Sequence, residues 1–276
     1  DEPGKGIRRL TMNRPEKHNA LNDDLRLAIF ENLRDADSDK DVSVIVIRGA
    51  GDSFCSGYDL TEYGEQNSTS SVIQDMPWDP IQDYQFMWRN TQHFMALWRA
   101  MKPVICKVHG FAVAGGSDIA LCADMTIMAE DAEIGYMPTR VWGTPTTAMW
   151  VQRLGPEKAK RMLFTGDKIN GLEAENMGLI LKSVPKAKLN EEVELLAQRM
   201  ATVPINQLAM QKMLVNQAME TSGLMQTQKM ATLFDGISRH SPEGIAFKQR
   251  VEKVGWKQAV EERDTGSFDW TKNRSI

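Results

Sequence analysis

The segment Val108-His109-Gly110-Phe111-Ala112-Val113-Ala114-Gly115-Gly116-Ser117-Asp118 follows a short apolar run with the length and composition of a buried β-strand. Its paired glycines open a predicted helix that ends near Cys122. The first turn of a helix leaves backbone N–H groups without partners inside the helix, at the positive end of its dipole. Such donors suit an anion, or an oxygen on which negative charge develops. Alternatively, the glycines only allow the helix to pack closely on the strand.

A second glycine-bearing turn, Phe54-Cys55-Ser56-Gly57-Tyr58-Asp59-Leu60, comes directly after another predicted strand at 42–47. Gly57 permits backbone conformations that other residues resist, so it can direct neighbouring N–H groups into a cleft. Taken alone, this segment favours a simple turn from strand to loop. The two turns together are more specific, because two N–H donors that meet at one carbonyl oxygen form an oxyanion hole suited to a thioester enolate.

The chain around these turns alternates strand and helix patterns as far as Pro204. Strands are predicted at 7–12, 42–47, 104–107 and 125–129, and helices at 23–35, 84–100, 116–122 and 146–154. Residues 61–82 are rich in Ser, Gln, Asn, Asp and Pro, and we interpret them as a mobile insertion or lid. Beyond Pro204, helix patterns at 206–218, 224–237 and 242–254 have no strands between them. We therefore expect an α/β region at 1–204 and an all-helical region at 205–276.

Composition and charge exclude several classes of protein. The 276 residues carry 33 basic and 37 acidic side chains, a net charge of -4, which provides no basic surface for nucleic acid. No run approaches the eighteen apolar residues that a membrane-spanning helix needs. Three cysteines without a CxxC pair suit a reducing cytoplasm, and four scattered histidines argue against a zinc or iron site. We expect a cytoplasmic protein with no metal and no nucleic-acid or membrane partner.

The two glycine turns and several further segments resemble the crotonase superfamily, the family of the enoyl-CoA hydratases and isomerases. The further segments follow in family order over nearly the whole chain: Asn13-Arg14-Pro15 with Asn19-Ala20-Leu21, Gly155 with Lys158-Ala159, Leu163-Phe164-Thr165-Gly166, Ala174 with Gly178-Leu179, and Glu243-Gly244 with Phe247. The resemblance implies a spiral of ββα units, followed by a C-terminal helical region that builds homotrimers, or hexamers from two trimers.

The resemblance also implies an acyl-CoA substrate, and no cofactor besides this CoA thioester. By motif position, the backbone N–H groups of Tyr58 and Gly115 would hold the thioester oxygen. The turn near His18 and Ala20, together with Leu60, stands where the family meets the adenine end of CoA. Phe247 matches a position that can approach the CoA of a neighbouring subunit.

Acid–base chemistry is where this chain departs from the family. Family hydratases carry two glutamates that activate water and supply a proton. The first position holds Asp118, whose side chain is one methylene shorter, and the second, counted back from Gly143, holds Thr139. A threonine cannot serve as a carboxylate acid or base. The replacement argues against the efficient two-glutamate mechanism.

Three interpretations stay open. In the first, Asp118 alone acts as the base, and hydration or isomerisation persists on an unusual substrate. In the second, the pocket performs another enolate reaction: thioester hydrolysis, C–C cleavage or decarboxylation. Protons or a site for a second carboxylate would then come from Tyr58, Tyr136, Arg140 or His109. In the third, the chain binds acyl-CoA without turning it over.

The loop around Thr139 supplies further candidates for substrate binding. Arg140 could hold an acidic substrate tail with two hydrogen bonds, although a lone arginine in such a loop more often pairs with a local aspartate. Tyr136 and Trp142 fit an acyl pocket and an aromatic core equally well. We expect an acyl-CoA enzyme of the enoyl-CoA hydratase/isomerase type, with a non-catalytic acyl-CoA-binding protein as the alternative from another class.

Overall fold

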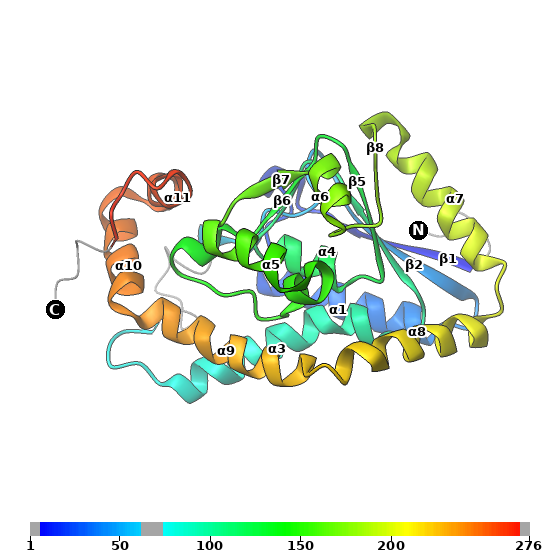
Figure 1. The fold of residues 1–276 in the computed structure, drawn as a ribbon, viewed down its shortest axis with the longest axis horizontal. Coiled ribbons are helices and arrows are strands. Elements are labelled where there is room, and N and C mark those ends of the chain that lie inside the picture. The colour runs from blue at the N-terminus through cyan, green and yellow to red at the C-terminus, as the bar shows by residue number, and fades with distance from the viewer. Residues whose placement is uncertain (1–5, 62–73, 271–276) are drawn as a thin grey trace.

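A parallel β-sheet forms the centre of the protein, as a computed structural model shows for residues 6–61 and 74–270 (Figure 1). Five strands pair in the order β1-β2-β3-β5-β8, and every neighbouring pair is parallel. Their bounds are Gly6–Met12, Val42–Gly49, Val104–Val108, Met125–Ala129 and Lys182–Val184. Apolar runs explain these strands, because a parallel sheet is covered on both faces; Val44, Ile45, Val46 and Ile47 of β2 are all buried.

A smaller sheet stands beside the first and completes the repeating ββα units. It consists of β4 (Phe111–Val113), β6 (Glu133–Gly135) and β7 (Lys168–Asn170), with β4 and β6 parallel and β6 and β7 antiparallel. One unit is therefore β3, β4 and α4 (Gly115–Cys122), and the next is β5, β6 and α5 (Met149–Thr165). The sequence patterns missed the strands of this sheet because three residues are too few to show a period.

Helices cover the main sheet. The helix α1 (Asp23–Ser38) and the helix α7 (Leu189–Ala201) both pack on β1 and β2, and Figure 1 shows them on different sides of the sheet. The helix α3 (Pro80–Arg99) packs on α1 and α4, and α6 (Gly171–Met177) packs on β8. Three short 3-10 helices complete this part, at Pro15–Lys17 (η1), Met137–Arg140 (η2) and Lys186–Lys188 (η3).

The C-terminal part consists of four helices, α8 (Ile205–Glu220), α9 (Leu224–His240), α10 (Pro242–Val254) and α11 (Trp256–Thr265). In Figure 1, α8 and α9 run along one side of the molecule, and α10 and α11 form the end opposite α7. The helix α9 packs on α3, and α11 packs on η2. This arrangement brings the end of the chain back to the loop that follows β6.

Two of the predicted boundaries were wrong. The helix expected at 146–154 begins at Met149 and continues to Thr165, with a kink at Gly155, whose φ is 72°. Residues 80–82, expected in a mobile insertion, belong to α3, and Asp79 caps that helix by accepting hydrogen bonds from the N–H groups of Ile81 and Gln82. Of the expected insertion 61–82, residues 62–73 lie outside the described residues, whereas 74–79 are described as the irregular segment that leads into α3.

Three expectations about the chain as a whole have different outcomes. Within 6–61 and 74–270, no helix has the length and apolar character needed to cross a lipid bilayer. The division at residue 204 and the cytoplasmic location both stay predictions.

Candidate active site

The turn that contains Gly57 runs as an extended segment between β4 and Leu21. Cys55 donates its N–H to the carbonyl of Phe111 and accepts from the N–H of Val113, at 2.7 and 3.1 Å. Two residues further on, the carbonyl of Gly57 accepts from Leu21 at 2.7 Å, and the N–H of Asp59 donates to Leu21 at 2.9 Å. Because polar groups of successive residues in an extended chain point to opposite sides, the N–H of Tyr58 is directed away from Leu21.

The two glycine turns meet. A Cβ placed on Gly57 would lie 2.9 Å from the Cβ of Ala114 and 3.5 Å from the nitrogen of Gly115. A Cβ placed on Gly115 would lie 3.4 Å from Cε2 of the Tyr58 ring. The backbone of Tyr58 and the backbone of Gly115 are therefore neighbours, although 57 residues separate them in the sequence.

The paired glycines have different functions. Gly115 is the first residue of α4, so its N–H lies in the turn where the helix provides no acceptor. A Cβ on Gly116, by contrast, would lie 2.3 Å from the carbonyl oxygen of Cys55, which no side chain can tolerate. Gly116 therefore allows the helix to pack closely on its neighbour, and the N–H of Gly115 is in a position to donate a hydrogen bond to a ligand.

The residue that precedes α4 is strained. Ala114 has φ 50° and ψ −122°, a conformation that is costly for a residue with a Cβ. The surrounding bonds hold it there: its N–H donates to Gly135 at 2.9 Å, and its carbonyl accepts from the N–H groups of Ser117 and Asp118 at 2.9 and 3.2 Å. Strain of this kind persists only where other contacts enforce it, and here it fixes the direction of the Gly115 N–H.

A largely apolar pocket of about 270 Å³ opens at this junction. Its walls come from both glycine turns, the loop 136–143, α3, α9 and α11. The lining residues are Ser56, Tyr58, Leu60, Met87, Val113, Ala114, Tyr136, Met137, Pro138, Trp142, Gly143, Asp235, Arg239, Val260, Arg263 and Asp264. Among the residues predicted from the sequence, Tyr58, Leu60 and Tyr136 lie on this surface.

Asp118 lies behind the pocket wall and is not among the lining residues. Only 2% of it is exposed, and its Oδ1 accepts a hydrogen bond of 2.6 Å from the hydroxyl of Thr147. The pKa of this carboxyl is raised from 3.8 to about 7, mainly by burial and to a smaller extent by the nearby Asp235, against the opposing effect of the bond from Thr147. Asp118 can therefore hold and release a proton near neutral pH.

Tyr136 stands on the pocket surface and is held from behind. Its hydroxyl donates to the carbonyl of Thr144 at 3.1 Å. Burial raises the pKa of this phenol well above 10, with Asp118, Asp235 and Tyr58 adding to the effect, so Tyr136 is neutral over the physiological range.

Thr139 and Arg140 do not line the pocket. The hydroxyl of Thr139 donates to the carbonyl of Leu163 at 2.6 Å, which holds η2 against α5. Arg140 is exposed, and its side chain lies beside Gly166. The position of the missing glutamate therefore contributes no polar group to this surface.

The residues expected at the CoA end occupy three different places. His18 is exposed, has a left-handed backbone and lies with Nδ1 3.1 Å from the hydroxyl of Ser53; its carbonyl accepts from Ser56, a lining residue. Ala20 is buried, and its carbonyl accepts a bond of 2.6 Å from Arg14. Phe247 is fully buried in an aromatic cluster of its own chain, behind the lining residue Trp142, with ring centroids 5.4 Å apart.

His109 has a structural place. Its Nε2 donates to the carbonyl of Gly51 at 2.8 Å, and the residue is buried at the turn between β3 and β4. Burial lowers the pKa of this imidazole, so it is neutral at pH 7.

Sequence reasoning missed a buried ion network on the other side of the pocket. Arg239 of α9 lies 3.1 Å from Oδ2 of Asp235 and 2.8 Å from Oδ1 of Asp83. Oδ1 of Asp235 also accepts the N–H of Thr144 at 2.8 Å. Burial raises the pKa of Asp83 to about 6 and raises that of Asp235 as well, against the opposing effect of Arg239. The only signal in the sequence was an Asp and an Arg four residues apart, which is typical of an exposed helix pair.

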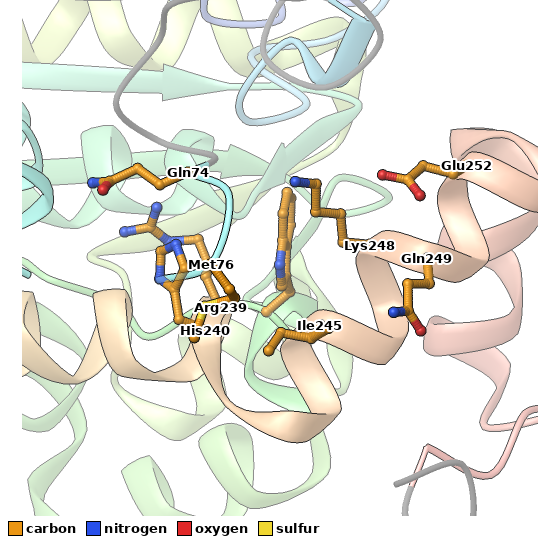
Figure 2. A pocket seen from close by; sticks show the side chains of 9 residues that line it. Gln74, Met76, Arg239, His240, Ile245, Lys248, Gln249 and Glu252 are labelled. Carbon is orange, nitrogen blue, oxygen red and sulfur yellow. The ribbon is translucent and has the colours of Figure 1, made fainter. Parts of the chain in front are cut away.

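A second pocket of about 200 Å³ adjoins the first and shares Trp142 and Arg239 with it. Figure 2 shows Arg239 and His240 of α9, with Gln74 and Met76, on one side of this pocket. On the other side are Ile245, Lys248, Gln249 and Glu252 of α10. The ring of His240 stacks on Trp78 at 4.1 Å, which packs the segment before α3 onto α9.

Comparison with known proteins agrees with this architecture. Residues 2–259 match the family model described as enoyl-CoA hydratase/isomerase. The chain is similar to a crystal structure of an enoyl-CoA hydratase from Mycobacterium smegmatis, with 42% identity and a TM-score of 0.89 over 100% of this chain and 96% of that one. It is 32% identical to the crotonyl-CoA hydratase of Syntrophomonas wolfei, over 92% of this chain and 91% of that protein. It is 29% identical to the 1,2-epoxyphenylacetyl-CoA isomerase of Escherichia coli, over 80% and 82% respectively.

Proposed function

The chain belongs to the enoyl-CoA hydratase/isomerase family, and we propose that it adds water to the double bond of a 2-enoyl-CoA ester. One observation supports this proposal: the two glycine turns meet beside an apolar pocket that Tyr58 lines, and a Cβ on Gly57 would lie 3.5 Å from the nitrogen of Gly115. Two donors in this position stabilise the negative thioester oxygen of an enolate. Each donor of such a pair contributes about 100- to 1000-fold to kcat.

The sequence predicted Asp118 as the base; we propose instead that this carboxyl, which lies behind the lining residues, is the source of the proton that C2 of the ester gains. A carboxyl group with a pKa of about 7 is about half protonated at pH 7 and can act as a general acid under physiological conditions. Its hydrogen bond from Thr147 fixes the orientation of the carboxyl.

The CoA part of the substrate has its proposed place at the rim formed by the first glycine turn. Leu60 lines the pocket, and Ser56 links the lining to His18 and to the neighbouring Ala20. Phe247 would act there only indirectly, through Trp142. Thr139 and Arg140 are not assigned to the substrate, because the Thr139 hydroxyl bonds to the carbonyl of Leu163 and the exposed Arg140 lies beside Gly166.

Isomerisation of the double bond is the second candidate. Moving a proton from one carbon to another needs one acid–base group rather than two, and Thr139 removes one of the two family carboxylates. Thioester hydrolysis, C–C cleavage, decarboxylation and binding without turnover are distinguished from both by the test below.

An apolar surface on α8 and α9 supports the proposal that the chain forms homotrimers, alone or paired as hexamers. Eight apolar side chains on these helices are between 41 and 67% exposed: Met210, Met213, Leu214, Val215, Met230, Leu233, Phe234 and Ile237. Exposed apolar side chains in this number on two neighbouring helices favour a protein interface. Light scattering should give three or six times the mass of the chain, and a monomer would contradict the assembly.

The test of the reaction is a set of acyl-CoA esters analysed by absorbance and mass spectrometry. Hydration of crotonyl-CoA removes the enoyl absorbance and adds one water to the mass, whereas isomerisation leaves the mass unchanged. Release of free CoA or of carbon dioxide would replace hydration by one of the other enolate reactions. Tight binding of every ester with no product would make the chain a binding protein.

A further inference from the structure

Hydration needs a base for water as well as an acid for carbon, and position 139 supplies no carboxylate. Among the described residues that line the pocket, Asp235 and Asp264 are the two with carboxyl groups. Asp264 pairs with Arg263 and has a side chain 29% exposed, whereas the side chain of Asp235 is 5% exposed. We propose that Asp235, on α9, replaces the missing carboxylate of the loop after β6 and accepts the proton of the attacking water. This inference rests on the proposed hydratase function.

The carboxyl of Asp235 is held firmly on the pocket surface. Thr144 donates its N–H to Oδ1 at 2.8 Å, and the guanidinium of Arg239 lies 3.1 Å from Oδ2. Arg239 is fixed in turn by Asp83 of α3 at 2.8 Å. Charge-assisted bonds of this kind orient a carboxylate without using all of its lone pairs.

Gly143 lies next to this carboxyl. A Cβ placed on Gly143 would lie 2.8 Å from the Cβ of Pro138, and 3.7 Å from both Oδ1 of Asp235 and the hydroxyl of Tyr136. The two polar groups are therefore close to the same lining residue, and both line the pocket themselves.

Burial raises the pKa of both carboxyl groups, but their partners differ. Asp235 has a guanidinium partner and a backbone donor, which oppose this rise and favour the ionised form, whereas Asp118 receives a neutral hydroxyl from Thr147. The other titratable groups that face Asp235 are His240 on its own helix, Asp83 on α3, and Asp118 and Tyr136 across the pocket. The carboxyl with the cationic partner is the better candidate for the base, and the carboxyl without one is the better candidate for the acid.

The resulting step balances. The water oxygen bonds to C3 of the enoyl ester, its proton passes to Asp235, and the electron pair of the C2–C3 double bond moves onto the thioester oxygen. The enolate then returns this electron pair as C2 takes the proton of Asp118. One water has been added, and a proton moves from Asp235 to Asp118 through solvent before the next turnover.

The experiment compares Asp235→Asn with Asp83→Asn on crotonyl-CoA. Both aspartates are buried and pair with Arg239, but only Asp235 lines the pocket, so Asp83→Asn controls for loss of the ion network. Asp235→Asn should lower kcat at least about 100-fold, the lower range for an acid–base group, while the Kd of the saturated ester butyryl-CoA changes little. Asp83→Asn should retain most of kcat.

Three outcomes decide the matter. Equal kcat losses in the two variants would overturn the catalytic assignment and leave Asp235 a structural residue, with the proposed function intact. If Asp235→Asn does not fold, Asp235→Ala with added formate replaces it: recovery of kcat supports the base, and lack of recovery in a folded variant overturns it. A parent chain that hydrates no enoyl-CoA ester overturns the proposed function and this inference together.

Discussion

The two walls of the pocket are built in different ways. One wall is backbone: the turns at 54–60 and 110–118 present N–H groups whose direction depends on glycines and on the strained Ala114. The other wall is side chains: Asp235 and Arg239 come from α9, and their positions depend on how that helix packs against α3. The proposed donors for the thioester can be predicted from local sequence, whereas the charged groups of the facing wall depend on long-range packing.

Substitution of Gly116 should have the largest effect, because it breaks the backbone wall. In Gly116→Ala the new Cβ would lie 2.3 Å from the carbonyl of Cys55, so the two turns must separate. We expect kcat on crotonyl-CoA to fall about 1000-fold, the upper range for loss of an oxyanion-hole donor.

Gly178 provides the matched control for this glycine. Its φ of 81° disfavours any residue with a side chain, but a Cβ placed there would have no atom within 4 Å. Gly178→Ala should cost about 1 kcal/mol of stability and leave kcat unchanged. Equal losses of kcat in both variants would show that general destabilisation, and not the turn, causes the effect.

Arg239→Met should have the next largest effect, because it disrupts the ion network of the side-chain wall. It leaves Asp83 and Asp235 buried without their cation, which we expect to lower the free energy of unfolding by about 3–5 kcal/mol. Thermal and urea unfolding measure the change. Lys188→Met, which removes an exposed pair with Glu191, should have a much smaller effect, and a similar loss there would contradict the importance of burial.

Asp118 should make the stability of the protein depend on pH. Its folded-state pKa, about 7, lies above the unfolded value near 3.8, so the folded protein binds a proton more tightly. Stability should therefore fall as pH rises from about 4 to 7, by about 1.4 kcal/mol for each pH unit from this group alone. In Asp118→Asn this slope should be absent from urea unfolding, and kcat should be lost while butyryl-CoA still binds. An unchanged pH slope would show that Asp118 is ionised in the folded protein.

Thr139→Val should have the smallest effect. Within the described part of the chain, its hydroxyl has a single hydrogen-bond partner, the carbonyl of Leu163, so about 1 kcal/mol of stability depends on it. We expect kcat to be unchanged, which the crotonyl-CoA assay checks. A large loss of kcat would place Thr139 in the reaction after all and contradict its position outside the pocket.

Much of the fold could be predicted from local patterns. The strand at 125–129 and the helix at 242–254 have the expected bounds, and Asn22 caps α1 through the N–H of Leu25. The strands of the small sheet could not be predicted, because three residues show no period. Within the site, Tyr58, Leu60 and Tyr136 reach the pocket, whereas Arg140 points away beside Gly166.

The sequence by itself determined the family, the order of the ββα units and the two glycine turns, because glycines, strand lengths and apolar periods act on neighbouring residues. Only the tertiary structure decided which carboxyl groups face the pocket. Asp118, three residues after Gly115, lies behind the lining residues. Asp235, 120 residues after Gly115, lies on the pocket surface. The physical reason is that burial and pairing, which set the charge and direction of a carboxyl group, come from packed helices distant in sequence.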